Sequence, residues 1–503
     1  MEDSDGLTRR QALIGSVSAL ALASCRTREQ HDASAEQAVG TGEPVAEATL
    51  PIQRLRLERT EGAPDGFRRS ILTVNGQYPG PILRLKKGQP VTFAIENATQ
   101  HPAANHWHGQ YQLGTWRMDG VPGVTQPAIP PGKTFTTRFT PAPAGTFWYH
   151  SHMLLYNGYP DGQYGALLVE DPEVDDLVPY DQESVLIIND WFHRTADEIL
   201  LALLNPPKSG NKENPGGGDV EWVSALINGK GRYEGGPNVP LETVEVEPGS
   251  VTRFRIINAS STYELYFSID NHDFTVFAAD GTPVKPLSGD SLRVPIGARY
   301  DLLVKANSSG VHWIRVANSA GQEGLGVLRY KGTAATEPPP AAPKKPSRPL
   351  VRSMLSSNAP MTVPDTDVKR FEFALTGSMT PYIWTMSGQR YPVSEEILVN
   401  KGDQVRVVLT NKTMMAHPFH LHGHGFWILG DPDNPSLSNR PKVDTVVVPA
   451  FGRTAIQFEA DNPGKWIFHC HIDWHLATGM ARVFRYQSID NLASNTFPPG
   501  TLT

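Results

Sequence analysis

The stretch GQPVTFAIEN, residues 88–97, is a glycine turn followed by an alternating segment that ends at an asparagine. Alternation of apolar and polar residues is typical of a β-strand with one buried face. The same pattern recurs as GSVTRFRIIN at 249–258 and as GDQVRVVLTN at 402–411. The glycines at 88, 249 and 402 are 161 and 153 residues apart, about the length of one domain. The repeat therefore predicts three related β-sandwich domains in tandem.

The composition agrees with this prediction. A chain of 503 residues is long enough for about three domains, and its 45 glycines and 43 prolines are typical of strands joined by many turns. The net charge of −7 is mild and the sequence has no basic stripe, so we expect no nucleic-acid partner. The two cysteines, Cys25 and Cys470, do not provide a disulfide framework.

Histidine pairs occur at matching places in the first and third copies of the repeat. HWH at 106–108 begins eighteen residues after the glycine of the first copy, and HLH at 420–422 begins eighteen residues after that of the third. Later, GTFWYHSH at 145–152 and GKWIFHCH at 464–471 both place histidines five and seven residues after a glycine. The two outer domains thus carry four His-x-His pairs in two matched registers.

The middle copy has Phe267 and Ile269 at the first register and Arg315 and Ala317 at the second. Residues i and i+2 of a strand project from one face, so each His-x-His pair points two imidazoles in the same direction. A single pair would be read as a solvated strand face or a buried structural histidine. Four pairs in register indicate metal ligands, because imidazole is the commonest metal ligand in proteins. We expect one cluster between the first and third domains, with the middle domain as a spacer.

The segment HCHIDWHLATGM, residues 469–480, contains Cys470 between two histidines. If His469 and His471 face the cluster, strand alternation makes Cys470 face the opposite side. A thiolate with two imidazoles and a weak thioether is the ligand set of a blue-copper electron-transfer centre. The other members of such a set lie nearby in the sequence: His417, His475 and Met480. The strand would therefore connect a single copper with the histidine cluster.

At this point the sequence resembles the multicopper oxidases, a family that includes laccases, ascorbate oxidase and ferroxidases. The resemblance covers roughly residues 50–490 and rests on four motifs: HWHG (106–109), HSH (150–152), HPFHLHGH (417–424) and HCHIDWHLATGM (469–480). It implies an all-β fold of three tandem cupredoxin-like Greek-key β-sandwich domains. It also implies four copper ions, namely one type 1, one type 2 and a type 3 pair.

The resemblance also implies a role for each ligand. The type 1 copper would take His417, Cys470 and His475, with Met480 as the axial ligand. The type 2 copper would take His106 and His420. The type 3 pair would take the remaining six: His108, His150, His152, His422, His469 and His471.

The implied reaction couples four one-electron oxidations of a reductant to the reduction of O2 to two H2O. Two aspartates at family positions are candidates for supplying the protons, Asp119 in RMDGV (117–121) and Asp473 within HCHID. The alternative for Asp119 is a turn aspartate before Gly120.

The N-terminal segment 1–25 looks like a twin-arginine export signal, with arginines at 9–10 before a short apolar run. The run is too short to cross a bilayer stably. Its end has two interpretations: ALA at 21–23 fits a cleavage site, whereas LASC at 22–25 resembles a lipobox that would anchor the protein by a lipid on Cys25. Both place the protein in the periplasm or cell envelope of a bacterium.

The sequence also predicts where each part of the chain begins and ends. The parts are a signal (1–25), a flexible tether (26–48), a first domain with cluster ligands (49–172), a second domain without copper (173–333), a proline-rich connector (334–364), a third domain with type 1 and cluster ligands (365–490) and a C-terminal tail (491–503).

Three functions are compatible with these motifs. The leading hypothesis is a laccase-like oxidase of phenols or aromatic amines. The second is a metallo-oxidase of Cu(I) or Fe(II) that protects the envelope, which would need acidic or methionine ligands beside His417 and His475. The third is a copper-binding envelope protein without turnover, which the complete ligand set disfavours. We expect a monomer whose partners are O2 and a small-molecule or metal-ion reductant.

The remaining histidines and the methionines are interpreted as structural. The histidines are off the ligand registers, in the middle domain or in the tether, and the six methionines between 354 and 415 are read as core filling.

Overall fold

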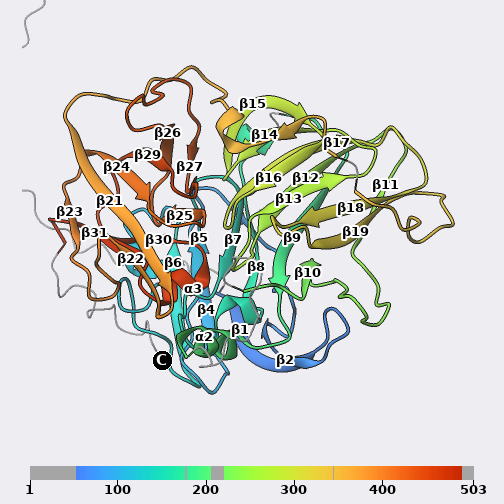
Figure 1. Ribbon diagram of the computed structural model, residues 1–503, viewed down its shortest axis with the longest axis horizontal. Helices are drawn as coiled ribbons and strands as arrows, with labels where there is room; N and C mark the ends of the chain where they lie inside the picture. The colour runs from blue at the N-terminus through green and yellow to red at the C-terminus, as the bar shows by residue number, and fades with distance from the viewer. Residues whose placement is uncertain (1–51, 176–177, 206–219, 344, 490–503) are drawn as a thin grey trace, which may run out of the picture. The chain divides into compact units, whose positions relative to one another are not determined.

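The computed structural model describes residues 52–175, 178–205, 220–343 and 345–489, which form three β-sandwiches in chain order (Figure 1). The predicted signal, tether and C-terminal tail, together with Cys25, lie outside the described residues. Among the described residues, none of the helices is both long enough and apolar enough to span a bilayer.

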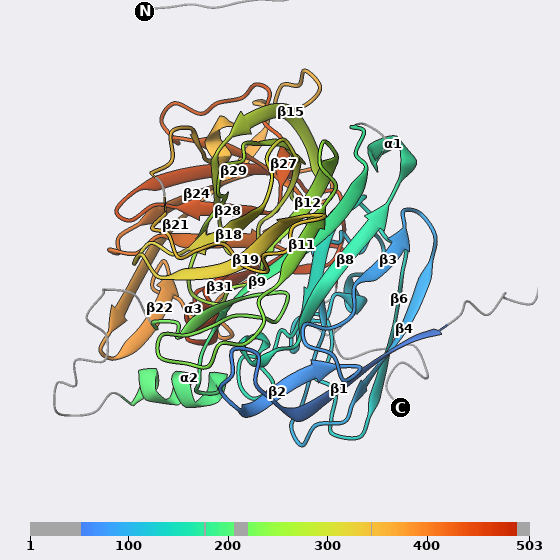
Figure 2. The same ribbon diagram turned by 90° about the vertical axis from the view of Figure 1, so that its right-hand side faces the viewer.

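The first domain consists of two four-stranded sheets around one core (Figure 2). One sheet has the order β2 (Arg69–Val74), β1 (Ile52–Gly62), β4 (Val91–Asn97) and β6 (Thr134–Phe139). The other has the order β3 (Leu83–Lys86), β8 (Tyr164–Glu170), β7 (Gly145–His150) and β5 (His106–His108). Alternate residues of β4 enter the core, among them Phe93 and Ile95, as the sequence pattern predicts.

The second domain consists of two six-stranded sheets. The first has the order β10 (Ser224–Ile227), β9 (Gln182–Trp191), β12 (Val251–Asn258), β17 (Arg299–Lys305), β14 (Phe274–Ala279) and β15 (Thr282–Gly289). The second has the order β11 (Thr243–Val246), β19 (Glu323–Tyr330), β18 (Val311–Ala317), β13 (Leu265–Ile269), β16 (Ser291–Val294) and β20 (Pro349–Leu350). The last of these strands comes from the proline-rich connector.

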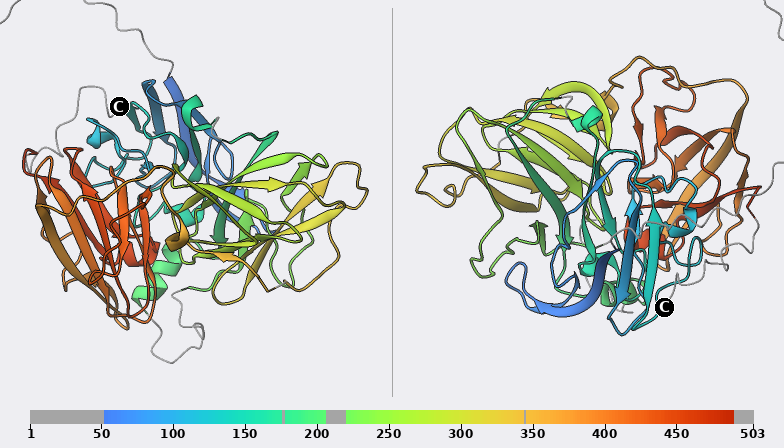
Figure 3. Two further views of the ribbon diagram at one scale, coloured as in Figure 1. Left: turned by 90° about the horizontal axis from the view of Figure 1, so that it is seen from above. Right: turned by 180° about the vertical axis from the view of Figure 1, so that it is seen from behind.

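The third domain repeats the arrangement (Figure 3). One sheet has the order β22 (Tyr382–Met386), β21 (Val368–Met379), β24 (Gln404–Asn411), β29 (Arg453–Glu459), β26 (Phe426–Gly430) and β27 (Lys442–Val443). The other has the order β23 (Ile397–Val399), β31 (Ala481–Tyr486), β30 (Lys465–Cys470), β25 (His417–Leu421) and β28 (Thr445–Val448).

The helices of the described residues are short. They are α1 (Pro172–Asp175), α2 (Ala196–Leu204) and α3 (Asp473–Ala477), with three 3-10 turns, η1 (Trp116–Met118), η2 (Tyr159–Asp161) and η3 (Arg352–Met354).

The three domains share one strand connectivity. In each, the repeat strand pairs in parallel with the strand that opens the domain, as in β1–β4, β9–β12 and β21–β24. In each, a short strand before the repeat pairs in parallel with the last long strand, as in β3–β8, β11–β19 and β23–β31. Parallel neighbours need crossover connections, so the same pairs in three copies define one topology. The prediction of an all-β fold with three tandem cupredoxin-like domains is confirmed.

The asparagine that ends each repeat strand has the same role in all three domains. Asn97, Asn258 and Asn411 are buried. Each Oδ1 accepts a hydrogen bond from the backbone N–H two residues later, at 3.0, 2.9 and 2.9 Å. Each Nδ2 donates to a backbone carbonyl four or five residues later, across the following loop, at 2.8, 3.3 and 2.7 Å. The asparagine closes the loop that leads to β5, β13 or β25.

The middle domain fills the histidine positions with packing residues. Phe267 and Ile269 are buried in its hydrophobic core, and the guanidinium of Arg315 pairs with Asp270 at 2.8 Å. The same backbone therefore supports either a metal cluster or an apolar core.

Replacing Asn258 by alanine should lower the free energy of unfolding of the middle domain by about 2 kcal/mol, because the loop would lose its hydrogen bonds and leave buried backbone groups without partners. Urea unfolding measures the change. The exposed Asn307→Ala in the same domain is the control, with an expected change below about 0.5 kcal/mol. Equal losses in the two variants would contradict the role of the asparagine.

Candidate metal centres

Strands from the first and third domains bring eight histidines into one buried cluster. His106 lies opposite His150 in the β5–β7 pair, and His420 lies opposite His469 in the β25–β30 pair. Neighbouring ligand atoms form triads whose members lie within 4.8 Å of one another. The eight are His106, His108, His150, His152, His420, His422, His469 and His471.

The closest approaches in the cluster join ring nitrogens. His422 Nε2 lies 3.1 Å from His469 Nε2, and His108 Nδ1 lies 3.3 Å from His471 Nε2. The second pair joins the first domain to the third. Two imidazole lone pairs this close repel each other unless a proton or a cation lies between them.

Backbone hydrogen bonds fix the orientation of several rings. The Nδ1–H groups of His106, His150 and His420 donate to backbone carbonyls at 2.8, 2.7 and 2.8 Å. This places the lone pair of each ring on Nε2, and these three Nε2 atoms are buried without a hydrogen-bond partner among the described residues. Buried polar atoms normally have a partner, and metal ions bound in the cluster would satisfy these three.

Burial keeps several histidines of the cluster neutral. The pKa values of His150, His152 and His422 lie well below the usual range of histidine. Desolvation is the largest cause, and repulsion by the neighbouring imidazoles is the second. Burial lowers the pKa of His471 to about 3. A neutral imidazole is the form that coordinates a metal ion, so the cluster is prepared for binding at neutral pH.

Asp119 orients one histidine of the first domain and one histidine of the third domain. Its Oδ2 accepts a hydrogen bond from His422 Nδ1–H at 2.8 Å, and its backbone carbonyl is the acceptor for His106 Nδ1–H. The side chain is completely buried. It follows η1 and precedes Gly120, where φ is +95° and an added Cβ would lie 1.9 Å from the carbonyl oxygen of Asn105. Asp119 is thus a turn residue that also orients the cluster.

Asp444 and Arg299 also hold the cluster, and no sequence motif pointed to them. Asp444 Oδ1 lies 3.4 Å from His108 Nε2 and 3.5 Å from His420 Nδ1. Arg299, from the middle domain, donates to both carboxylate oxygens of Asp444 at 2.7 and 2.6 Å. Burial raises the pKa of this carboxyl, but the guanidinium outweighs burial and holds the pKa well below its usual range.

The middle domain therefore does more than separate its neighbours, and the expectation of a spacer was incomplete. Besides the arginine, its backbone at Gly297 packs on the cluster, where an added Cβ would lie 3.0 Å from His471 and 3.1 Å from His108. Gly297 has φ +79°, so both its conformation and its surroundings require glycine.

Cys470 belongs to a second centre on the other face of β30. Its Sγ lies 3.7 Å from His417 Nδ1 and 3.6 Å from His475 Nδ1, and the two nitrogens are 3.1 Å apart. All three residues are fully buried. A soft thiolate with two imidazoles is a donor set that fits copper.

Thr413 selects the tautomer of His417. Its hydroxyl donates to Asn411 Oδ1 at 2.8 Å and accepts a hydrogen bond from His417 Nε2–H, also at 2.8 Å. The lone pair of His417 is then on Nδ1, which faces Cys470. The asparagine of the repeat thus has a direct consequence for the ligand geometry.

The chain after Cys470 brings Met480 back to this centre. The helix α3 carries His475, whose carbonyl accepts a hydrogen bond from Met480 N–H at 2.9 Å. The Met480 carbonyl accepts one from Cys470 N–H at 3.0 Å, and the side chain is fully buried. Trp384, from β22, covers the other side of His475, with ring centroids 3.8 Å apart.

Asp473 lies in a small cavity beside the cluster, which is also lined by His150, His152, His469 and His471. Its pKa is raised to about 8, mainly by burial and to a smaller extent by the negative charges of Asp190 and Asp161. At neutral pH the side chain is a neutral acid that can donate a proton into this cavity.

The other described histidines have hydrogen bonds or ring contacts of their own, as predicted. His272 and His424 bond to tyrosine hydroxyls at 2.7 Å, and His193 bonds to Asp65 at 2.9 Å. His31 lies outside the described residues. The interpretation of the methionines as core filling was wrong for three of them, because Met354, Met379 and Met414 are exposed.

Comparison with known proteins agrees with this geometry. Multicopper oxidase family models match residues 56–174, 182–333 and 364–490. Laccase-2 of Agaricus bisporus is 33% identical over 484 residues, which cover 87% of this chain and 90% of the relative. Laccase-1 of Fomitopsis schrenkii is 34% identical, with 88% and 87% covered.

Solved structures show the same fold. The laccase from Botrytis aclada has a TM-score of 0.75 and 29% identity, with 90% of each chain covered. Fet3p, a multicopper oxidase that functions in iron import, has a TM-score of 0.80 at 24% identity, with 90% of this chain and 94% of that chain covered. The chain belongs to the multicopper oxidases, and its two histidine-rich centres fit the copper sites of such an enzyme.

Replacing Arg299 by methionine should destabilise the copper-loaded protein by about 3–5 kcal/mol, because Asp444 would become a buried charge without its partner. It should also reduce the copper bound per chain. Urea unfolding and metal analysis measure the two effects. Arg329→Met removes a partly exposed arginine paired with Glu245 and should cost less than about 1 kcal/mol. If Arg299→Met lowers the free energy of unfolding no more than Arg329→Met does, the buried pair of Arg299 and Asp444 does not stabilise the cluster.

The stability of the copper-free protein should depend on the protonation of Asp473. The folded state keeps the carboxyl protonated up to about pH 8, whereas the unfolded chain ionises it near ~4. The folded state therefore binds one more proton between these values, and this group lowers stability as pH rises, by up to about 1.4 kcal/mol per pH unit. Asp473→Asn should remove that part of the slope in urea unfolding between pH 5 and 8. An unchanged slope would show that the carboxyl is ionised when folded.

Proposed function

We propose that the protein is a laccase-like oxidase that couples four one-electron oxidations of phenols or aromatic amines to the reduction of O2 to two H2O. The observation that carries this proposal is the connection of two centres through one strand. Cys470 contacts His417 and His475, while the residues on either side of it belong to the eight-histidine cluster.

The ligand roles that we propose are those that the family resemblance implies. His417, Cys470 and His475 would hold the type 1 copper, and Met480 would be its weak fourth ligand. His106 and His420, which lie in a common triad with His422, would hold the type 2 copper. The remaining six histidines of the cluster would hold the type 3 pair.

Copper at these positions supplies one-electron transfer and dioxygen reduction. The protein supplies the path and the protons. The Cys470 side chain and the backbone that joins it to His469 and His471 would provide the electron path between the two centres. Asp473 holds a proton at its carboxyl beside the cluster, and Asp119 keeps His106 and His422 oriented.

The reductant has a site beside the type 1 centre. A cavity of about 240 Å³ is lined by Met415, Ala416 and Pro418, which flank His417, and by Tyr263 and Ile472. These surroundings favour an aromatic molecule over a strongly hydrated ion.

The metallo-oxidase alternative has less support. Glu221, Glu264 and Met414 also line this cavity, but Glu264 is bound by Arg293 at 2.7 and 2.5 Å. Within the described part of the chain, the groups of histidine, cysteine and carboxylate side chains that could hold a metal all belong to the two copper centres or to Asp444 beside them.

The location remains a proposal from the sequence alone. The twin arginine supports export of the folded protein to the bacterial envelope, either soluble or anchored through Cys25.

Oxygen uptake by the copper-loaded protein tests the function, with a dimethoxyphenol, Fe(II) or Cu(I) as sole reductant. We expect turnover with the phenol at least ten times faster than with either metal ion, at four phenol oxidations per O2. Faster uptake with a metal ion would replace the proposal by the metallo-oxidase. Absence of uptake with all three would indicate a copper-binding protein.

Cys470→Ser should abolish the blue absorption and phenol oxidation, because the thiolate is the soft ligand and the start of the electron path. The cluster copper should remain, since its histidines are unchanged. Absorption spectra, metal analysis and oxygen uptake check these outcomes. Blue colour that persists in this variant would refute the assignment of Cys470.

A further inference from the structure

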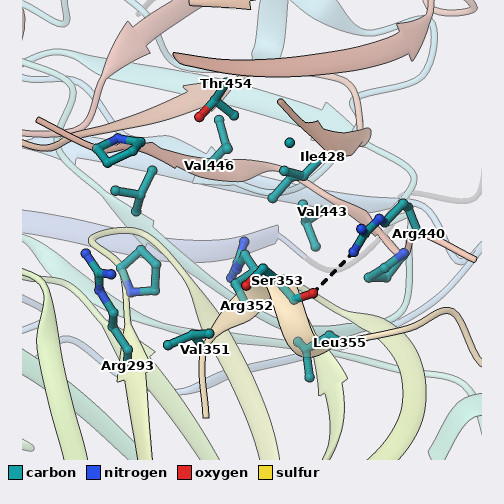
Figure 4. Close-up of a pocket in the computed structure, with 15 residues that line it drawn as sticks. Arg293, Val351, Arg352, Ser353, Leu355, Ile428, Arg440, Val443, Val446 and Thr454 are labelled. Atoms are coloured by element: carbon teal, nitrogen blue, oxygen red, sulfur yellow. Dashed lines mark hydrogen bonds between the residues drawn. The ribbon is translucent and has the colours of Figure 1, made fainter. Parts of the chain in front are cut away.

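A second cavity, of about 330 Å³, lies between the middle domain, the connector and the third domain (Figure 4). Neither copper centre nor the reductant site uses it. Its volume falls in the range of small-molecule binding sites, which begins near ~300 Å³. The three chain segments around it are joined by hydrogen bonds, such as the one from Arg440 to the Ser353 carbonyl at 3.2 Å.

Most of the wall is apolar. Val351 and Leu355 come from the connector, and Ile428, Val443 and Val446 come from the third domain. Figure 4 shows these side chains around a common space, with Arg293 and Arg440 at opposite ends. Val351 and Ile428 are partly exposed, so the space is open to solvent. A ligand bound in this cavity would bury its apolar part against these side chains.

Three arginines line the same cavity, and two of them are neutralised. Arg293 is bound by both oxygens of Glu264, and Arg352 is bound by both oxygens of Asp280 at 2.5 and 2.9 Å. Their charges are balanced, but guanidinium groups also stack on aromatic rings.

Arg440 is different. It donates to Ser436 Oγ at 3.1 Å and to the Ser353 carbonyl, and among the described residues no carboxylate forms an ion pair with it. The cavity thus combines apolar walls with one positive charge that is not balanced by an acidic side chain. A ligand that complements it carries a single negative charge on an apolar body.

We propose that this cavity binds a small aromatic carboxylate. The carboxylate would pair with the Arg440 guanidinium, whose fork of N–H donors matches two carboxylate oxygens. The ring would lie between Val351 of the connector and the valines of the third domain. It would then be within reach of the planar guanidinium groups of Arg293 and Arg352. The cavity shares only Val447 with the reductant cavity, so a carboxylate without a phenol group should bind without being oxidised.

Occupation should stabilise the contact between the middle and third domains. Arg352 lines the cavity and also donates to the Thr445 carbonyl at 2.6 Å, and Asp280 accepts a hydrogen bond from Asp444 N–H at 3.2 Å. A ligand held against Arg352 therefore contacts the network that positions Asp444. Binding to the folded state alone raises the melting temperature.

Calorimetry of the copper-loaded protein with 4-tert-butylbenzoate tests the proposal. We expect a dissociation constant below about 1 mM, a raised melting temperature, and at least tenfold weaker binding of the neutral 4-tert-butylbenzamide. Arg440→Gln should weaken benzoate binding at least tenfold and leave phenol oxidation unchanged. The control Arg370→Gln removes an exposed arginine that does not line the cavity, and binding should be unchanged.

The variant Val351→Phe tests whether the benzoate binds in this cavity. The larger side chain at the partly exposed edge should fill the cavity and abolish benzoate binding, while the blue absorption shows that the variant is folded. Lack of binding to the wild-type protein would overturn the proposal. So would binding that survives both Arg440→Gln and Val351→Phe, because the benzoate would then occupy another site.

Discussion

The alternation of side chains along β30 is the constraint on which the rest of the structure depends. A strand presents successive residues to opposite faces, so one short segment serves two metal centres without mixing their ligands. Cys470 is directed to His417 and His475, and its neighbours in the sequence are directed to the cluster. Any shift of register by one residue would exchange the two sets, and both centres would be lost together.

The cluster also depends on charges that cross domain boundaries. Asp119 of the first domain orients His422 of the third, and Arg299 of the middle domain fixes Asp444 beside His108 and His420. Such buried pairs are costly unless every partner is in place. The ligand geometry of the copper sites is therefore complete only when the three domains are assembled. The middle domain has no metal ligands at the equivalent positions, but it has a structural role in the site.

The sequence predicted the features that repeat. The strand at 88–97 and its two counterparts revealed three domains, and the registers of the His-x-His pairs identified the eight imidazoles, because strand geometry converts spacing directly into side-chain direction. Residues that act through tertiary contacts carried no such signal. Arg299 stands in a domain without ligands, and Trp384 reaches His475 from a distant hairpin. Arg440 differs from the two other arginines of its cavity because no carboxylate of the described residues forms an ion pair with it. The repeated asparagine was visible in the sequence, but its reason, the closure of a loop before each ligand strand, needed the structure.

The most direct measurement is a crystal structure of the copper-loaded protein with anomalous diffraction recorded at the copper absorption edge. We expect one copper between Cys470 Sγ and the Nδ1 atoms of His417 and His475, and three coppers enclosed by the eight histidines of the cluster. Copper bound to other residues, or a histidine cluster that holds no copper in a fully loaded protein, would contradict it.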